Sequence, residues 1–153
     1  PLNQNSVKNS KNQSQENLYM CKKKRIISYI RTAIGEMELV EQMSEPIVEA
    51  DDFGKDLNGM TIFRACSMSI QCVTENFTKV RNCTKSGFFK RYKTIPWSQV
   101  FGMRNFIVHE YANVDEEAIF TTIKQDLPTL KEVSKLILQD LHSGTLDEYI
   151  EET

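Results

Sequence analysis

The stretch RIISYIRTAIGEMELVEQM, residues 25–43, decides the fold class. Its apolar residues recur at the i, i+3, i+4, i+7 spacing of a single helix face, and charged residues fill the positions between them. These apolar residues are Ile26, Ile27, Ile30, Ile34, Met37, Val40 and Met43. Pro46 should end this helix, because a proline disfavours helical backbone at the preceding residue. The stretch therefore predicts a long amphipathic helix that must pack against other helices.

A second helix and a connector follow. Residues 47–59 contain Asp, Gly and Asn, which favour turns. Residues 60–80 repeat the helical spacing of apolar side chains. They predict a second long helix joined to the first by an irregular connector.

Two more helices are expected in the second half of the chain. Pro96 suits the first turn of a helix that ends near residues 112–113, with Thr94 as a candidate cap. Asp115 should cap a fourth helix with an acidic first turn, and Pro128 should kink or split it. No alternation typical of strands competes with these patterns. The predicted fold is therefore all-α, an up-and-down helical bundle of four main helices plus short helices.

The composition divides the chain into three parts. Residues 1–20 are rich in Asn, Gln, Ser and Lys and have little to bury, which predicts a disordered N-terminal tail. Within it, the letters ENLYM at 16–20 suggest a remnant of recombinant expression, in which case the natural chain begins at Met20. Residues 21–144 form the predicted bundle, and residues 145–153 an acidic C-terminal tail.

Several classes of protein are disfavoured. Apolar residues make up 40% of the chain and charged residues 26%, which is ordinary for a globular protein. Apolar runs fall short of the roughly 18–20 residues that span a bilayer, and the N-terminus lacks an apolar signal segment. The cysteines form no CxxC pair and only two histidines are present, so we expect no metal site and no cofactor. Free thiols in a reducing cytoplasm are the expected state.

Charge is distributed unevenly along the chain. The net charge is only −2, which does not mark a nucleic-acid-binding protein. Yet residues 79–104 carry seven basic side chains and no acidic one, whereas residues 105–153 carry three basic and eleven acidic. A local positive field of this kind can attract a polyanion even when the net charge is negative.

The basic segment ends in GMRNFIVHEY, residues 102–111. On an ideal helix of about 100° per residue, Asn105 and His109 share one side, with Ser98 and Gly102 preceding them. Arg104 lies about 140° from His109 and close to Tyr111. One helix therefore does not direct Arg104 and His109 at a single small point. They can flank an extended ligand such as a phosphodiester, or meet the copies from a twofold partner.

Two interpretations of these residues stand side by side. In the structural one, Arg104 pairs with a helix acid such as Glu75, while His109 and Tyr111 make hydrogen bonds in the core. In the catalytic one, His109 transfers protons near neutral pH and Arg104 holds a phosphate. Together they form a minimal set for metal-free cleavage of a phosphodiester.

At these residues the sequence resembles the HEPN superfamily, and in particular HepT toxins of HepT–MntA toxin–antitoxin pairs. The signature of that family is an arginine usually followed by a polar residue, then four to six further positions, a histidine, any residue and a tyrosine. Arg104, His109 and Tyr111 match its three defining positions, and Asn105 matches the polar one. The flanks IPW (95–97) and YANVDEEAIFTTIKQDLPTL (111–130) resemble the family as well. The resemblance covers roughly residues 22–140.

This resemblance implies a dimeric helical bundle with the two motif helices lining a shared cleft. It implies a metal-independent endoribonuclease that acts on RNA, in some members tRNA, with Arg104 and His109 as the catalytic pair and Asn105 in support. It also implies that a cognate MntA-type nucleotidyltransferase neutralises the protein by AMPylating Tyr111. Glu110 departs from the pattern, and its carboxylate would either raise the pKa of His109 or repel phosphate.

Two alternatives remain open. Some members of the superfamily are not nucleases, so a non-catalytic scaffold that binds a nucleotidyltransferase is the second candidate function.

The segment KSGFFKRYK, residues 85–93, is basic and aromatic: Lys85, Lys90, Arg91 and Lys93 alternate with aromatic rings. The segment is either an RNA-binding surface with stacking rings or a solvated loop whose phenylalanines plug the core. His142, near a glycine, is expected to cap a helix C-terminus.

Overall fold

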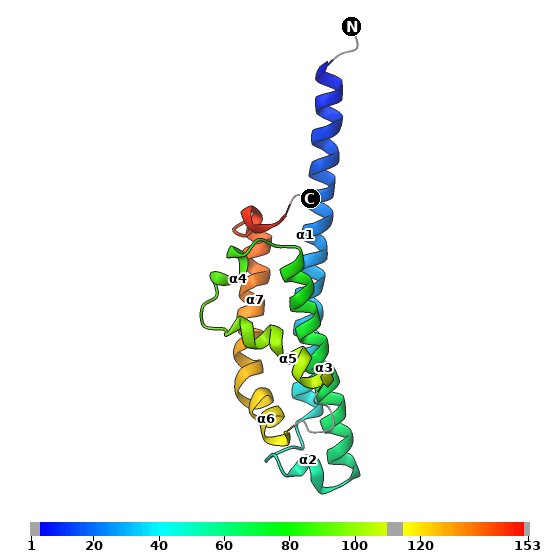
Figure 1. The fold of residues 1–153 in the computed structure, drawn as a ribbon, viewed down its shortest axis with the longest axis vertical. Coiled ribbons are helices and arrows are strands. Elements are labelled where there is room, and N and C mark those ends of the chain that lie inside the picture. The colour runs from blue at the N-terminus through cyan, green and yellow to red at the C-terminus, as the bar shows by residue number, and fades with distance from the viewer. Residues whose placement is uncertain (1–3, 110–114, 152–153) are drawn as a thin grey trace.

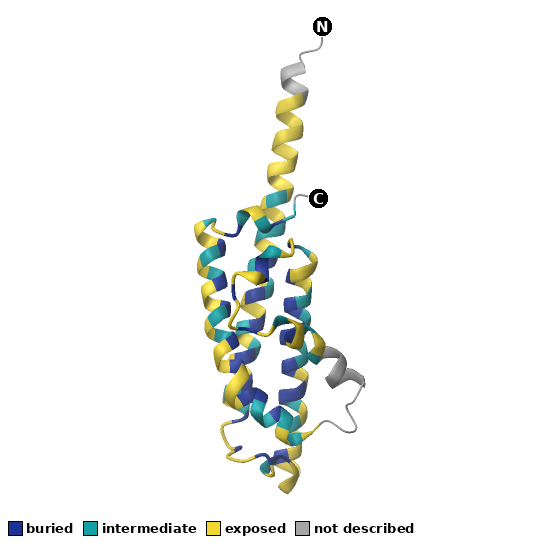
Figure 2. Cartoon of the chain, turned by 60° about the vertical axis from the view of Figure 1, so that its left-hand side comes forward, coloured by how far each residue is buried: buried dark blue, intermediate teal, exposed yellow. Residues whose placement is uncertain are grey.

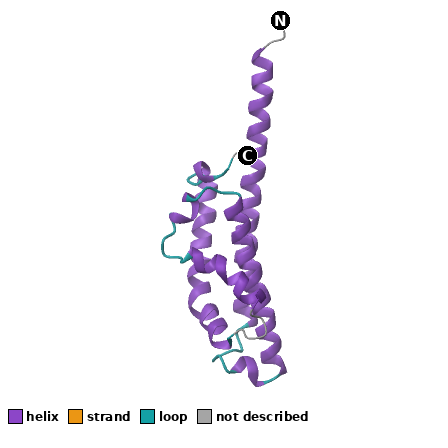
Figure 3. Cartoon of the chain, viewed as in Figure 1, coloured by secondary structure: helices purple, strands orange, loops and turns teal. Residues whose placement is uncertain are grey.

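The computed structural model describes residues 4–109 and 115–151, and the side chains of residues 8–103 and 115–151 (Figure 1). Three long helices form the frame: α1 (Gln4–Met43), α3 (Leu57–Asn82) and α7 (Leu127–Ser143). A shorter helix, α5 (Trp97–His109), packs on α3. The remaining elements are α2 (Asp52–Lys55), α4 (Gly87–Lys90), α6 (Glu116–Thr121), the π-helical turn η2 (Thr122–Asp126) and the 3₁₀ turn η3 (Asp147–Tyr149). The described residues have no strand, which confirms the all-α prediction (Figure 3).

The core lies along the shared faces of α1, α3 and α7 (Figure 2). On α1 the buried residues recur at alternating spacings of four and three, from Ile26 to Val40, as the sequence predicted. The buried positions of α7 repeat this spacing from Leu127 to Leu141. Such spacing keeps one stripe of each helix directed at its neighbours. The three helices therefore enclose a continuous apolar core.

The connector before α3 is more ordered than the sequence indicated. Residues 52–55 form the short helix α2, which the turn-rich composition concealed. Phe53 of α2 is fully buried and contacts Phe63 of α3, with ring centroids 5.2 Å apart. Asp56 then caps α3 by accepting a hydrogen bond from the Gly59 amide over 2.7 Å. One buried phenylalanine thus holds the connector to the bundle.

Gly59 marks the closest approach of α2 to α3. A Cβ at this position would collide with the Asp52 carbonyl oxygen and lie 3.2 Å from that of Phe53. Since both obstacles are backbone atoms, Gly59→Ala is expected to lower the free energy of unfolding by about 1–3 kcal/mol. Urea denaturation measures this loss. Gly35→Ala is the control, because a Cβ there meets no atom within 4 Å; equal midpoints for both variants would contradict the prediction.

The predicted fourth helix is interrupted as expected. Asp115 caps α6 by accepting a hydrogen bond from the Glu117 amide over 2.9 Å. The π-helical turn η2 separates α6 from α7, and Pro128 stands in the first turn of α7. Proline has no amide hydrogen to continue the helical pattern, which explains the break. Pro128 was predicted to kink or split this helix, and the structure shows a π-helical turn directly before the turn that contains it.

Both ends of the chain differ from the predicted tails. Helix α1 is continuous from Gln4, although its residues 8–18 are exposed. Once the packed part of α1 has formed a helix, further turns add to it without new nucleation. At the other end, Leu146 and Ile150 are buried, and Ile150 forms a β-bridge with Thr84. The segment from residue 145 is therefore part of the bundle.

Two ion pairs tie α1 to the C-terminal third of the chain. The Lys131 Nζ lies 2.6 Å from the Glu41 Oε1, and the Lys23 Nζ lies 2.7 Å from the Asp147 Oδ1. Burial alone would raise the pKa of Asp147, but the hydrogen bond from Lys23 lowers it below its usual value.

Within the described ranges no helix combines the length and apolar character that crossing a membrane requires.

Candidate functional site

Helix α5 carries the predicted catalytic residues. Arg104, Asn105 and His109 lie in its last two turns, and their side chains are outside the described set. Tyr111, the predicted modification site, lies outside the described residues altogether, as does Glu110. What the structure provides is the backbone of α5 and the elements that hold it.

An aromatic cluster fixes the first half of α5. The Trp97 ring lies 5.4 Å from Phe77 of α3 and 4.5 Å from Phe89, measured between centroids. Phe101 lies 5.4 Å from Phe89. The Trp97 indole also donates a hydrogen bond to the Tyr92 carbonyl over 2.9 Å. The start of α5 is therefore held on α3 and α4, so the direction in which its last turns project is fixed by packing.

The predicted polar residues stand at helical spacings from the described first half of α5. Ser98 and Gly102 are exposed, and they precede Asn105 and His109 by seven residues each. Residues seven apart fall on nearly the same side of an α-helix. Arg104 stands seven residues after Trp97 in the sequence. The backbone is helical as far as His109, and the directions of the Arg104 and His109 side chains lie outside the described set.

Two depressions border α5 on the side of Gln99 and Met103. One is a mostly apolar cavity of about 170 Å³ between α3, α5 and the start of α7. The other is an open groove lined by Gln99, Gly102, Met103, Ala118, Ile119, Thr122 and Asp126. No side chain at Gly102 obstructs this groove, and a Cβ there would meet no atom within 4 Å. The groove borders Gly102, which stands seven residues before His109, and no local pattern in the sequence predicted it.

Of the two interpretations of residues 85–93, the one in which the phenylalanines plug the core is confirmed. Phe88, Phe89 and Tyr92 are buried, so their rings cannot stack on bases in this conformation. The Tyr92 hydroxyl donates to the Asp140 Oδ2 over 2.6 Å, and burial together with this carboxylate raises the pKa of Tyr92. The helical pattern of this short segment was too brief to show which side faces inward.

The basic side chains of the same segment are exposed, as an RNA-binding surface requires. Two of them contact the C-terminal turn. The Lys85 Nζ donates to the Glu148 carbonyl over 3.1 Å, and a hydrogen bond to Tyr149 raises the pKa of Arg91. Lys90 and Lys93 are exposed. A role for these four residues in binding RNA stays a prediction.

Other chemistry is sparse in the described part of the chain. It contains no cluster of histidine, cysteine and acidic residues that could hold a metal ion. Its four cysteines are free thiols, and burial raises the pKa of Cys66 to about 11, which keeps that thiol protonated and unreactive. His142 bonds the Leu138 carbonyl through Nδ1 over 2.7 Å at the end of α7, which confirms its predicted capping role.

Comparisons with known proteins converge on one family. The model of a family described as "Ribonuclease HepT-like" matches residues 30–137. A protein of Caldanaerobacter subterraneus subsp. tengcongensis, named "Putative RNase TTE0752", is 31% identical over 112 residues, covering 72% of this chain and 92% of its own. A protein of Thermococcus cleftensis, named "Probable ribonuclease HepT", is 25% identical over 103 residues, covering 67% and 86%. No solved structure matches the chain significantly.

Proposed function

The chain belongs to the ribonuclease HepT-like family, and we propose that it is a metal-independent endoribonuclease that cleaves RNA with Arg104 and His109. The observation that carries this proposal is the family match over residues 30–137, which includes the whole of α5 and the helices that hold it. The relatives named as ribonucleases support the same reaction class. The expected place of action is the cytoplasm, and tRNA is one candidate substrate.

The proposed reaction needs only groups that RNA and α5 supply. His109 removes the proton from a ribose 2′-OH, whose oxygen attacks the adjacent phosphorus. The bond from phosphorus to the 5′-oxygen breaks, and that oxygen leaves as a 5′-OH by taking a proton from solvent water, to which His109 returns the proton it removed. Arg104 stabilises the extra negative charge on the phosphorane, and Asn105 helps to hold the phosphate. The products are a 2′,3′-cyclic phosphate and a 5′-OH end.

A second copy of the chain is part of the proposal. In the register of α5, Arg104 and His109 lie on different sides of the helix. Two α5 helices related by a twofold axis would bring the arginine of one copy near the histidine of the other. The homodimer would then build the cleft that a single chain lacks.

The test is RNA cleavage in EDTA by the wild-type chain and by an Arg104→Ala/His109→Ala variant. Loss of cleavage in the variant supports the proposal. Identical degradation by both proteins would leave the second candidate, a non-catalytic scaffold for a nucleotidyltransferase.

We also propose that a cognate MntA-type nucleotidyltransferase acts as antitoxin by AMPylating Tyr111. Tyr111 stands seven residues after Arg104 in the sequence, a separation that on an ideal helix would place the two on one side. A nucleotide attached there would place a phosphate and a bulky base next to the arginine. It would therefore compete with RNA for the same charge.

Tyr111→Phe should abolish this modification, because phenylalanine has no hydroxyl to accept AMP. Intact mass spectrometry after co-expression with the partner is expected to show whole added AMP units on the wild type and none on the variant. Tyr149→Phe, which removes a hydroxyl elsewhere in the chain, is the control. Persistent AMP units on Tyr111→Phe would assign the target to another residue.

A further inference from the structure

A polar depression lies between α1 and the C-terminal turn of α7, on helices other than α5. It is lined by Lys24, Ile27, Ser28, Arg31, Thr32 and His142. Lys24, Ser28 and Arg31 follow the i, i+4, i+7 spacing and so share one side of α1. The depression therefore brings two permanent cations, two hydroxyls and an imidazole to one place.

The two cations are not neutralised by neighbouring acids. Among the described residues, neither Lys24 nor Arg31 lies within ion-pair distance of a carboxylate. The carboxylates nearest in the chain to His142 have other partners. Asp147 pairs with Lys23 over 2.7 Å, and the Asp140 Oδ2 accepts the Tyr92 hydroxyl over 2.6 Å. The positive charge of the depression is thus available to a ligand.

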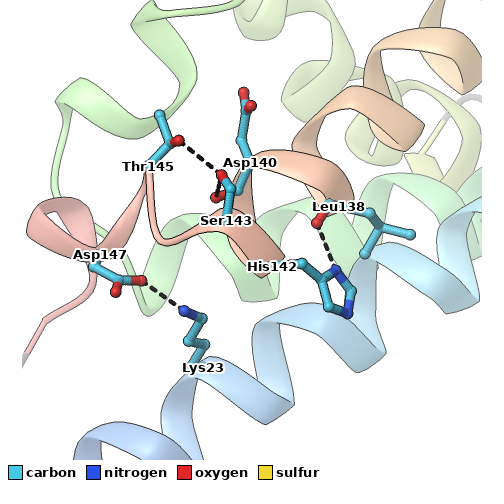
Figure 4. A network of polar contacts seen from close by, with 7 residues as sticks. All are labelled: Lys23, Leu138, Asp140, His142, Ser143, Thr145 and Asp147. Carbon is cyan, nitrogen blue, oxygen red and sulfur yellow. Dashed lines mark hydrogen bonds and ion pairs between the residues drawn. The ribbon is translucent and has the colours of Figure 1, made fainter.

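The carbonyl groups at the end of α7 oppose an anion less when they accept hydrogen bonds. The Asp140 carbonyl accepts the Thr145 amide over 3.0 Å, and the Leu141 carbonyl accepts the Gly144 amide. The Asp140 carbonyl also accepts the Ser143 hydroxyl over 3.1 Å (Figure 4). The Leu138 carbonyl binds His142 Nδ1, which must therefore carry a proton. This bond fixes the ring beside α1, and in the imidazolium form the other nitrogen also donates.

We propose that this depression binds a backbone phosphate of RNA outside the cleavage site. Lysine, arginine and hydroxyl groups are the usual protein ligands of phosphate oxygens. The His142 imidazole is the one ring in the lining and Ile27 the one apolar residue, so cations and hydroxyl groups predominate. The site therefore holds the backbone irrespective of sequence. The choice of RNA as ligand rests on the proposed function. The expectation that the depression binds a phosphate group rests on its lining alone.

The test compares two double variants of equal charge in a His109→Ala background, so that RNA stays intact whether or not the wild type cleaves it. Lys24→Ala/Arg31→Ala removes the cations of the depression. Lys11→Ala/Arg25→Ala removes one lysine and one arginine of α1 that are exposed and do not line it. Affinity for single-stranded RNA, measured by fluorescence anisotropy across salt concentrations, should fall roughly tenfold for the first variant. Its salt slope should shrink by about 0.7, the loss of one phosphate contact.

Further probes separate the sources of phosphate. Inorganic phosphate should shift the NMR signals of His142 in the His109→Ala protein and not in the Lys24→Ala/Arg31→Ala version of it. Equal RNA affinities for the two double variants would overturn the proposal. So would binding to vesicles of anionic phospholipid that depends on Lys24 and Arg31 while RNA binding does not. Loss of cleavage is not part of these readouts, so a failure here is distinct from a failure of the ribonuclease proposal.

Discussion

RNA incubated in EDTA with the Arg104→Ala/His109→Ala variant is expected to remain intact while the wild-type chain cuts it. A positioned general acid or base contributes about 10²–10⁴ in rate, and removing a charge stabiliser adds to the loss without strict additivity. We therefore expect the cleavage rate to fall by at least about 10³-fold. Single-turnover cleavage of labelled RNA, with end-group analysis for the 2′,3′-cyclic phosphate, measures this effect.

Ser98→Ala is the matched control for this experiment. Ser98 is exposed on α5, two turns before Asn105 on the same side of the helix, and its removal leaves both proposed catalytic groups in place. Its cleavage rate should stay within a few-fold of the wild type. An equal loss of cleavage rate in Ser98→Ala and in the double variant would point to damage of α5 instead of loss of the catalytic groups.

Chelation of metal ions should leave the wild-type cleavage rate unchanged, because no step of the proposed reaction uses a metal.

Phe77→Ala should produce the largest loss of stability. Phe77 is fully buried on α3, and its ring lies 5.4 Å from Trp97 and 6.4 Å from Phe89. Truncating a buried phenylalanine costs about 3–5 kcal/mol, because the apolar contacts are lost and a cavity remains. Urea denaturation should show this decrease. Amide hydrogen exchange should increase most in α5, because Trp97 loses its contact with the Phe77 ring.

Phe120→Ala is the comparison for this variant. Phe120 is a partly buried phenylalanine of α6, outside the aromatic cluster of α3, α4 and α5. Its truncation should cost less and should leave exchange in α5 unchanged. A loss for Phe77→Ala no greater than that for Phe120→Ala would show that the cluster does not hold α5.

The sequence predicted those elements whose signal repeats over several turns. The buried stripe from Ile26 to Val40 and the helix cap at Asp115 could be predicted from the sequence, because periodicity and capping depend on nearby residues. Helix α2 was missed because four residues are too few for a period, and its stability comes from the contact of Phe53 with α3. The burial of Ile150 likewise involves Thr84, which follows α3 and lies more than sixty residues earlier in the chain.

The candidate site was predictable only as a set of residues. The spacing of Arg104, Asn105 and His109 identified them without reference to the rest of the fold. The groove between α5 and α6 arises from tertiary packing, which no local pattern encodes. The phosphate-binding depression was hidden for the same reason. Lys24 and Arg31 resemble ordinary solvated helix positions until His142, over a hundred residues later, is placed beside them.

The π-helical turn Thr122–Asp126 sets the rotational phase between α6 and α7. Its hydrogen bonds reach one residue further than those of an α-helix, so the turn accommodates one additional residue. If the same residues formed a regular α-helix, the additional residue would rotate α6 by about 100° against the bundle. Ile119 would then leave the core. The acidic start of α6, which follows the proposed catalytic motif in the chain, would face a different side. The wider hydrogen bonding of this one turn therefore determines which face of α6 meets the core.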